Sequence, residues 1–126
     1  MTRRLVVIPT YNEAGSIKSL IDLLFTSIPE CQVLVVDDGS PDGTALIVKA
    51  IKDGNKRLHL IERASKNGIG SAYRIAFVWA LEQGFDEVIE MDADGSHQVS
   101  DLLRMLDVKT MNPETDLVIG SRWIKS

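Results

Sequence analysis

The segment Asp92-Ala93-Asp94 carries two carboxylates at a spacing that suits a metal ion. Residues two apart on an extended backbone point to the same side, so both aspartates can contact one cation. Carboxylate oxygens are hard ligands that Mg²⁺ and Mn²⁺ prefer, and these ions complete their coordination with water and phosphate oxygens. The pair predicts a divalent cation that holds a diphosphate. Two solvated loop acids give the same pattern, and the motif alone leaves that alternative open.

Two further polar segments follow apolar runs, at residues 9–13 (Pro-Thr-Tyr-Asn-Glu) and 37–44 (Asp-Asp-Gly-Ser-Pro-Asp-Gly-Thr). Ligands of an open parallel sheet bind beyond the carboxyl ends of its strands, so we expect these segments and residues 92–97 at one edge. The acids crowded there would be Glu13, Asp37, Asp38, Asp92 and Asp94. Unit charges about 4 Å apart at an effective dielectric near 20 interact by about 4 kcal/mol, so a phosphate at this edge requires a cation.

Five short apolar runs predict strands that are covered on both faces. They lie at residues 5–8, 32–36, 58–61, 87–91 and 116–119. Between successive strands, apolar residues recur at the i, i+3, i+4 spacing of helices. Strands that alternate with helices require crossover connections, so the sequence predicts a three-layer α/β/α fold with a mainly parallel sheet.

The expected helix boundaries depend on residues that commonly cap helices. Asn12 is placed to cap the first helix, and Ser40, with a proline after it, is placed to cap the second. Residues 71–83 carry apolar side chains on more than one face, which predicts a largely buried helix that ends at Gly84. Ser100 is placed to cap a last helix before the fifth strand.

Length and composition favour one globular domain. The chain has 126 residues, of which 44% are hydrophobic and 25% charged. The net charge of −4 argues against nucleic acid as a partner, because nucleic-acid surfaces are basic. Cys31 is the only cysteine, which excludes an intrachain disulfide and favours a reducing, cytoplasmic setting. No apolar run approaches the roughly eighteen residues that span a bilayer, so any membrane contact of this segment is expected to be peripheral.

Other candidate phosphate-binding groups are few. Gly68-Ile69-Gly70 precedes a predicted helix, but it lacks the third spaced glycine of a dinucleotide-binding loop and follows the third strand instead of the first. This argues against an oxidoreductase. Among the basic residues, Arg122 is the best candidate for a phosphate contact, because it follows the fifth strand at the same predicted edge.

Five segments, in this order, resemble the family 2 inverting glycosyltransferases of GT-A fold. They are Val7 to Glu13, Val35 to Thr44, Gly68 to Ala72, Met91 to Asp94, and Gly120-Ser121-Arg122. Within the family, they are most similar to dolichol-phosphate mannose synthases and polyprenol-monophosphomannose synthases. The resemblance covers nearly the whole chain and implies the Rossmann-like fold of nucleotide-diphospho-sugar transferases.

The resemblance also assigns residues to a sugar-nucleotide site. Positions that match nucleoside contacts are Pro9, Tyr11, Glu13, Val36 and Asp38. Positions that match the diphosphate and metal motif are Asp92, Ala93 and Asp94. Arg122 matches a diphosphate-side arginine, and Ser96 replaces a glutamine that close relatives often have as a third metal contact. On this basis Asp92, Asp94 and Ser96 are the predicted metal ligands, and Asp94 and Arg122 the predicted catalytic residues.

The implied reaction moves mannose from GDP-mannose to a polyprenyl (dolichyl) phosphate with inversion, in the presence of Mg²⁺ or Mn²⁺. It would occur in the cytoplasm or at the cytoplasmic face of a membrane. Two alternatives stay open, namely a family 2 transferase that uses a UDP-sugar for polysaccharide or glycolipid synthesis, and a non-catalytic nucleotide-binding module. Because the family continues with acceptor-side and membrane-associated parts, we expect residues 1–126 to be the donor-binding part, truncated after the fifth strand and lacking the acceptor part.

Overall fold

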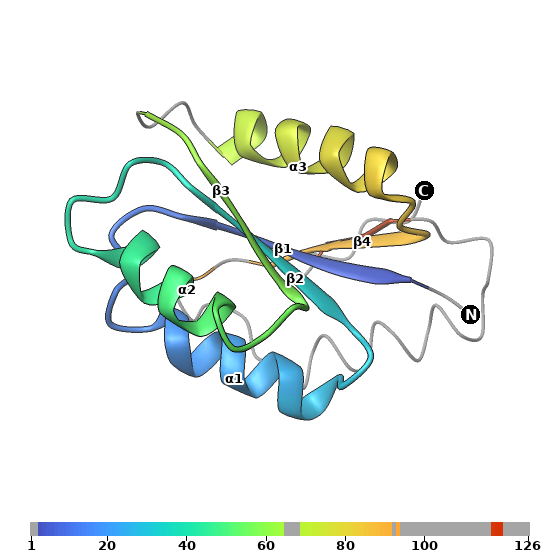
Figure 1. Ribbon diagram of the computed structural model, residues 1–126. Coiled ribbons are helices and arrows are strands. Elements are labelled where there is room, and N and C mark those ends of the chain that lie inside the picture. The colour runs from blue at the N-terminus through green and yellow to red at the C-terminus, as the bar shows by residue number, and fades with distance from the viewer. Residues whose placement is uncertain (1–2, 65–68, 92, 94–116, 120–126) are drawn as a thin grey trace.

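The computed structural model describes residues 3–64, 69–91, 93 and 117–119. Strands and helices alternate along them (Figure 1), as β1 (Arg4–Thr10), α1 (Ile17–Ser27), β2 (Gln32–Asp37), α2 (Thr44–Lys52), β3 (Leu58–Glu62), α3 (Ile69–Gln83), β4 (Glu87–Glu90) and β5 (Leu117–Ile119). All five predicted strands are present close to their predicted positions. The predicted last helix, with Ser100 as its cap, lies outside the described residues.

The strands form one five-stranded sheet in the order β3-β2-β1-β4-β5, and every neighbouring pair in it is parallel. Helices α1 and α2 cover one face of the sheet and α3 covers the other (Figure 1). The predicted three-layer α/β/α architecture is therefore confirmed. Because β2 and β3 extend to one side of β1, and β4 and β5 to the other, the strand order reverses between β1 and β4. Ligands of such sheets bind at this reversal, beyond the carboxyl ends of the strands.

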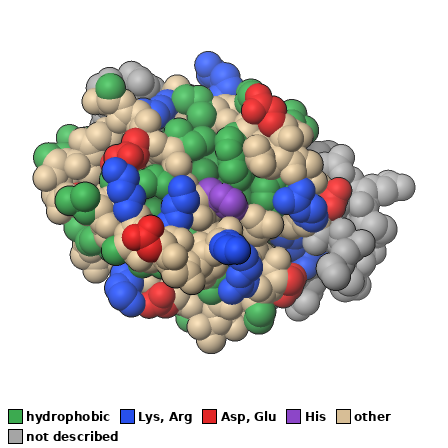
Figure 2. All heavy atoms as spheres, viewed as in Figure 1, with side chains coloured by type: hydrophobic (Ala, Val, Ile, Leu, Met, Phe, Trp, Pro, Cys, Tyr) green, Lys and Arg blue, Asp and Glu red, His purple; other side chains and the backbone are tan. Residues whose placement is uncertain are grey.

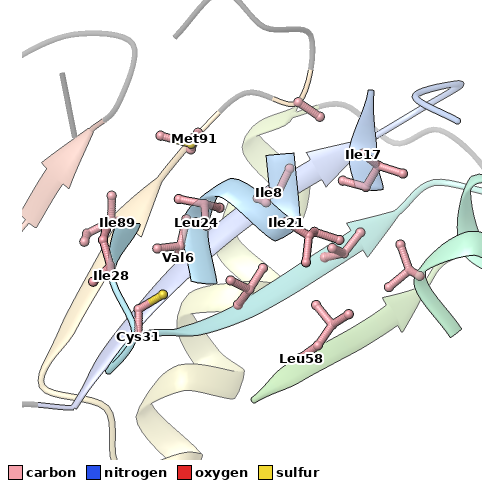
Figure 3. Close-up of a cluster of buried hydrophobic side chains, with 14 residues drawn as sticks. Val6, Ile8, Ile17, Ile21, Leu24, Ile28, Cys31, Leu58, Ile89 and Met91 are labelled. Carbon is pink, nitrogen blue, oxygen red and sulfur yellow. The ribbon is translucent and has the colours of Figure 1, made fainter. Parts of the chain in front are cut away.

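Alternation along the strands divides the core between the two faces of the sheet. Val6 and Ile8 of β1 pack against Ile17, Ile21 and Leu24 of α1 in one cluster of buried side chains (Figure 3). The intervening residues of β1 belong to a second cluster beneath α3. Because both faces of the central strands are covered, these strands are continuous apolar runs, which is why the sequence pattern located them.

Helix α3 is less buried than its sequence predicts. Its sheet-facing stripe consists of Ala72, Ala76 and Ala80, whereas its exposed apolar residues are Ile75 (37%), Val78 (53%) and Leu81 (77%). Alanines bring the helix backbone close to the sheet, so the larger side chains fall on its flanks, and the expectation of a largely buried helix is wrong. The predicted end is confirmed, because Gly84 follows with a left-handed φ of 79°. Neither α3 nor any other described helix is long and apolar enough to cross a membrane.

The two predicted helix caps that fall on described residues are wrong. Helix α1 begins at Ile17 instead of after Asn12, and α2 begins at Thr44 instead of after Ser40. Asn12 occupies a left-handed turn with a φ of 57°. The Ser40 hydroxyl donates to Asp37 and accepts from the Asn12 N–H, so it is engaged within and between the loops and does not cap a helix.

His59 lies on the edge strand β3, next to Trp79 of α3. The two ring centroids are 4.9 Å apart, and His59 Nε2 lies 2.7 Å from Gln32 Oε1. Figure 2 shows the histidine side chain at the surface among hydrophobic side chains, with Lys and Arg side chains nearby. Burial lowers the pKa of His59, and the positive charges of Lys52 and Arg3 lower it further. The fold therefore favours the neutral imidazole.

Acidification is expected to destabilise the fold through His59. The unfolded chain binds a proton there near the ordinary pKa of about 6.5, and the folded chain does so only at lower pH. The titration of His59 therefore leaves the stability of the fold unchanged above about pH 6.5 and lowers it as the pH falls below that value. In His59→Gln, the free energy of unfolding should fall less between about pH 7 and pH 5 than in the original chain. Urea unfolding across this range measures the difference, and parallel profiles of the two proteins would contradict the prediction.

Candidate functional site

Strands β1 and β4 separate before β1 ends. Their register extends only to Val7, whose carbonyl oxygen accepts the Met91 N–H at 2.9 Å. Pro9, two residues after Val7, also has its backbone nitrogen on the side of β4. Because proline has no N–H, β1 cannot donate a hydrogen bond to β4 at that point. On the other side, the Thr10 carbonyl oxygen still accepts the Asp38 N–H at 3.1 Å. The first strand was predicted at residues 5–8, but β1 continues through Pro9 to Thr10, because its pairing with β2 does not need the N–H that proline lacks.

Ala93, the central residue of the predicted metal motif, lies close to this separation. It is 3% exposed, and its carbonyl oxygen accepts the Ser16 hydroxyl at 3.0 Å. Ser16 Oγ also lies 3.3 Å from Glu13 Oε2. The hydroxyl thus ties the centre of the motif to the loop that follows β1, as expected for segments at one edge of the sheet.

The predicted metal and diphosphate ligands Asp92, Asp94, Ser96 and Arg122 lie outside the described residues, so their roles stay predictions. Within the part of the chain that is described, no three His, Cys, Asp or Glu side chains are grouped to hold a metal ion. The donor set in the sequence, two carboxylates and one hydroxyl, consists of hard oxygens that fit Mg²⁺ or Mn²⁺.

The residues predicted to contact a nucleoside differ in accessibility. Tyr11 is 39% exposed, and Glu13 and Pro9 are half-buried in or beside the loop after β1. Val36 is fully buried beneath α3 and pairs with Pro9 in the sheet. A ligand can therefore reach Tyr11 and Glu13 directly, whereas Val36 has no exposed surface. Contact of any of these residues with a nucleoside stays a prediction.

Asp38 forms a two-pronged ion pair with Arg63, a residue that sequence reasoning missed. Arg63 Nε and Nη2 donate to the two Asp38 carboxylate oxygens at 2.6 and 2.7 Å, and the side chains are only 7% and 9% exposed. Arg63 Nη1 donates to Ser71 Oγ at 2.7 Å, so the arginine also connects Asp38 to the first turn of α3. The signal was available, because Arg63 directly follows β3 at the same edge of the sheet.

Gly39 allows the loops after β2 and β3 to lie close together. It has a left-handed φ of 73°, and a Cβ atom at this position would lie 3.0 Å from the carbonyl oxygen of Ala64. Both the backbone conformation and the approach of Ala64 therefore require glycine. The close approach keeps Arg63 within reach of Asp38.

The acidic edge carries less free charge than predicted. Asp37 is 1% exposed, and Oδ1 accepts the hydroxyls of Thr10 and Ser40 at 2.7 and 2.6 Å. Its Oδ2 accepts the Ser40 N–H at 3.0 Å. Asp38 is neutralised by Arg63. Arg63 therefore offsets the charge of Asp38, whereas the partners of Asp37 are uncharged and leave its negative charge in place. The repulsion of a phosphate by this edge stays a prediction.

Residues 5–126 match the family model for glycosyl transferase family 2. The chain belongs to glycosyl transferase family 2, and the resemblance drawn from its motifs is confirmed.

Two bacterial relatives are similar along almost the whole chain. Polyprenol monophosphomannose synthase of Mycolicibacterium smegmatis is 44% identical over 124 residues, which are 97% of this chain and 46% of the relative. Undecaprenyl-phosphate mannosyltransferase of Micrococcus luteus is 47% identical over 121 residues, which are 95% of this chain and 48% of the relative. The chain thus spans about half the length of these relatives.

Solved structures show the same fold. The mannosyltransferase PcManGT from Pyrobaculum calidifontis, in complex with GDP-Man and Mn²⁺, superposes with a TM-score of 0.63 at 31% identity, over 73% of this chain and 27% of that one. TarS 1-349 of S. aureus, in complex with UDP, gives a TM-score of 0.66 at 25% identity, over 86% of this chain and 33% of that one. The predicted GT-A fold is confirmed.

Arg63→Met should destabilise the fold by about 3 kcal/mol, because it leaves the Asp38 carboxylate buried without its partner. Lys49→Met is the matched control, since Lys49 pairs with Glu62 at 3.0 Å while both side chains are about half exposed. That change should cost less than about 1 kcal/mol. Urea unfolding measures both values, and equal losses in the two variants would contradict a structural role for the Arg63 pair.

Proposed function

We propose that this chain is the donor-binding part of a glycosyltransferase that moves mannose from GDP-mannose to a polyprenyl phosphate. The observation that carries the proposal is the hydrogen bond from Ser16 to Ala93, where the strand order reverses. It joins the centre of the Asp-Ala-Asp motif to the start of α1, and the same hydroxyl oxygen lies 3.3 Å from Glu13 Oε2. The names of the two bacterial relatives support mannose and a polyprenyl phosphate. The GDP-Man and Mn²⁺ of the mannosyltransferase structure support the donor and the cofactor.

In this proposal, the nucleoside contacts Pro9, Tyr11, Glu13 and Asp38, with Val36 beneath them. Asp92, Asp94 and Ser96 would hold Mg²⁺ or Mn²⁺, and Arg122 would bind the diphosphate. Charge neutralisation of the diphosphate is the chemistry that the cation supplies when it is bound. Arg122 would stabilise the charge that develops on the departing nucleoside diphosphate.

The acceptor determines which other groups the reaction needs. A phosphate oxygen of the polyprenyl phosphate is anionic near neutral pH, so it can attack the anomeric carbon without a general base. The bond from that carbon to the GDP oxygen breaks as the new bond forms on the opposite face, which inverts the configuration and releases GDP. We propose that the transfer occurs at the cytoplasmic face of a membrane, because the acceptor is a lipid, and that parts outside this chain provide the peripheral membrane contact.

A second candidate function has specific support. The UDP-N-acetylglucosamine–dolichyl-phosphate N-acetylglucosaminyltransferase of Methanococcus voltae is 29% identical over an alignment of 129 positions, which covers 93% of this chain and 51% of the relative. The TarS structure also contains UDP. A UDP-sugar donor is therefore the alternative to test, together with a nucleotide-binding module that performs no transfer.

Titration calorimetry separates the candidate donors. GDP-mannose should bind in the presence of Mn²⁺ more tightly than UDP-glucose, and Asp94→Ala should weaken GDP-mannose binding by at least about tenfold. Asp22→Ala is the matched control, because Asp22 is an exposed acid on α1 that pairs with Lys18. Tight GDP-mannose binding that is unaffected by metal and by Asp94→Ala would refute the metal role, and tighter UDP-glucose binding would favour the alternative donor.

Transfer itself is tested with the full natural reading frame, labelled GDP-mannose and a polyprenyl phosphate. Labelled lipid should form in the presence of Mn²⁺, and Asp94→Ala should reduce the rate by at least about a hundredfold, because the leaving diphosphate loses its charge stabilisation. Thin-layer chromatography of the extracted lipid measures the product. Donor binding without any lipid product would favour the non-catalytic module.

A further inference from the structure

The loop after β1 (residues 11–14) is held by side chains of the loop after β2. Three successive backbone N–H groups, at positions 12, 13 and 14, each donate to a different side chain. Their acceptors are, in order, Ser40 Oγ at 2.8 Å, Thr44 Oγ1 at 3.0 Å and Asp42 Oδ2 at 3.0 Å. We call Ser40, Asp42 and Thr44 the loop ladder, because they stand at alternate positions and together accept the three successive N–H groups of residues 12–14.

The Thr44 bonds have a direction that chemistry fixes. Its hydroxyl accepts the Glu13 N–H and therefore gives its own proton to Asp42 Oδ1, at 2.5 Å. This hydrogen bond lowers the pKa of Asp42, and the Ala14 N–H contributes in the same direction. Asp42 is thus ionised at neutral pH and can accept the proton that the Thr44 hydroxyl donates.

Ser40 repeats the arrangement on the other side of the loop. Its hydroxyl accepts the Asn12 N–H and donates to Asp37 Oδ1 at 2.6 Å. Asp37 is 1% exposed and also accepts the Thr10 hydroxyl at the end of β1. Each hydroxyl of the loop ladder is therefore oriented by a carboxylate behind it, and one of these carboxylates is anchored in the sheet.

The loop that the ladder holds has little support from the core. Tyr11 is 39% exposed and Glu13 is half-buried, whereas Thr44 is completely buried at the first position of α2. Hydrogen bonds to a buried residue thus orient a surface loop whose own side chains are accessible to a ligand. Neither helix has a side-chain cap, because the N-cap residue of α1, Ser16, donates its hydroxyl to the Ala93 carbonyl oxygen, and the N-cap residue of α2 is Gly43.

We propose that Ser40, Asp42 and Thr44 are positioning residues of the donor site, which hold residues 11–14 in the orientation that binds the nucleoside. The proposal rests on the function proposed above. A loop that is ordered before the ligand arrives loses less freedom on binding, so the ladder raises affinity without touching the donor. Its effect is confined to the nucleoside, because the diphosphate is assigned to other residues.

Thr44→Val tests the proposal, because valine keeps the shape of threonine and lacks the hydroxyl. The dissociation constant for GDP-mannose with Mn²⁺ should rise about tenfold, whereas Thr44→Ser should restore the original affinity. Thr26→Val is the matched control, since Thr26 Oγ1 donates to the Asp22 carbonyl oxygen at 2.8 Å on the exposed side of α1. Calorimetry measures affinity, and thermal unfolding shows that each variant is folded.

Inorganic pyrophosphate with Mn²⁺ distinguishes positioning from a general loss of structure. It carries the diphosphate without a nucleoside, so Thr44→Val should leave its affinity within about twofold of the original value. Equal losses for pyrophosphate and GDP-mannose, or unchanged GDP-mannose affinity, would overturn the proposal.

Amide hydrogen exchange provides a readout that needs no ligand. The N–H groups of Asn12, Glu13 and Ala14 should exchange slowly in the original chain and in Thr44→Ser, and fast in Thr44→Val. Equal protection in all three proteins would show that the ladder does not order the loop.

An original chain that binds no GDP-mannose would contradict the function proposed above and the positioning role with it. GDP-mannose binding that Thr44→Val leaves intact would contradict the positioning role alone.

Discussion

Pro9 cannot donate a hydrogen bond, and it lies in the centre of the sheet on the side of β1 that faces β4. Pairing between these strands has already ended at Val7, while pairing with β2 continues to Thr10. The strands thus separate where the strand order reverses, which is where parallel sheets bind ligands. The position of Ala93, the course of the loop after β1 and the contacts between the three loops all follow from this separation.

Beneath that edge, the buried polar groups satisfy one another. A buried carboxylate is costly unless it is paired and hydrogen-bonded. Asp37 meets this requirement through three hydrogen bonds from Thr10 and Ser40, and Asp38 through two bonds from Arg63. Both adjacent acids therefore help to hold the loops together, and Arg63 offsets the charge of Asp38. The predicted need for a cation rests on the remaining acids, Glu13, Asp37, Asp92 and Asp94.

The sequence predicted those parts of the fold that depend on local periodicity. The strands were located because both faces of the sheet are buried, and parallel pairing followed from the alternation of strands and helices. The starts of α1 and α2 were not predicted, because Ser40 and Thr44 form hydrogen bonds with a loop about thirty residues away in the sequence. The exposure of α3 was missed because hydrophobicity alone does not show that alanines, being small, form the contact with the sheet.

For the candidate site too, the sequence predicted what local patterns determine and missed what long-range contacts determine. The rule for carboxyl ends of parallel strands predicted that the loop after β1, the loop after β2 and Ala93 lie at one edge, and hydrogen bonds of Asn12 with Ser40 and of Ser16 with Ala93 connect them there. Applied to β3 as well, the rule would have identified Arg63, which was missed because a single arginine after a strand has no motif around it. The pairing of Asp38 with Arg63 depends on the approach of Gly39 to Ala64, a long-range contact that local sequence does not encode.

The structural comparisons separate what the sheet determines from what the loops determine. Neighbours that contain GDP-Man and UDP superpose on this chain with similar TM-scores of 0.63 and 0.66. A sheet of this form therefore occurs in proteins whose structures contain nucleotides with different bases, as expected where function depends on residues added to a common fold. In this chain those loops are fixed by polar contacts, namely the Asp38–Arg63 pair and the loop ladder, while the apolar core lies beneath them. The polar contacts that fix these loops are therefore separate from the apolar core that holds the sheet and helices together.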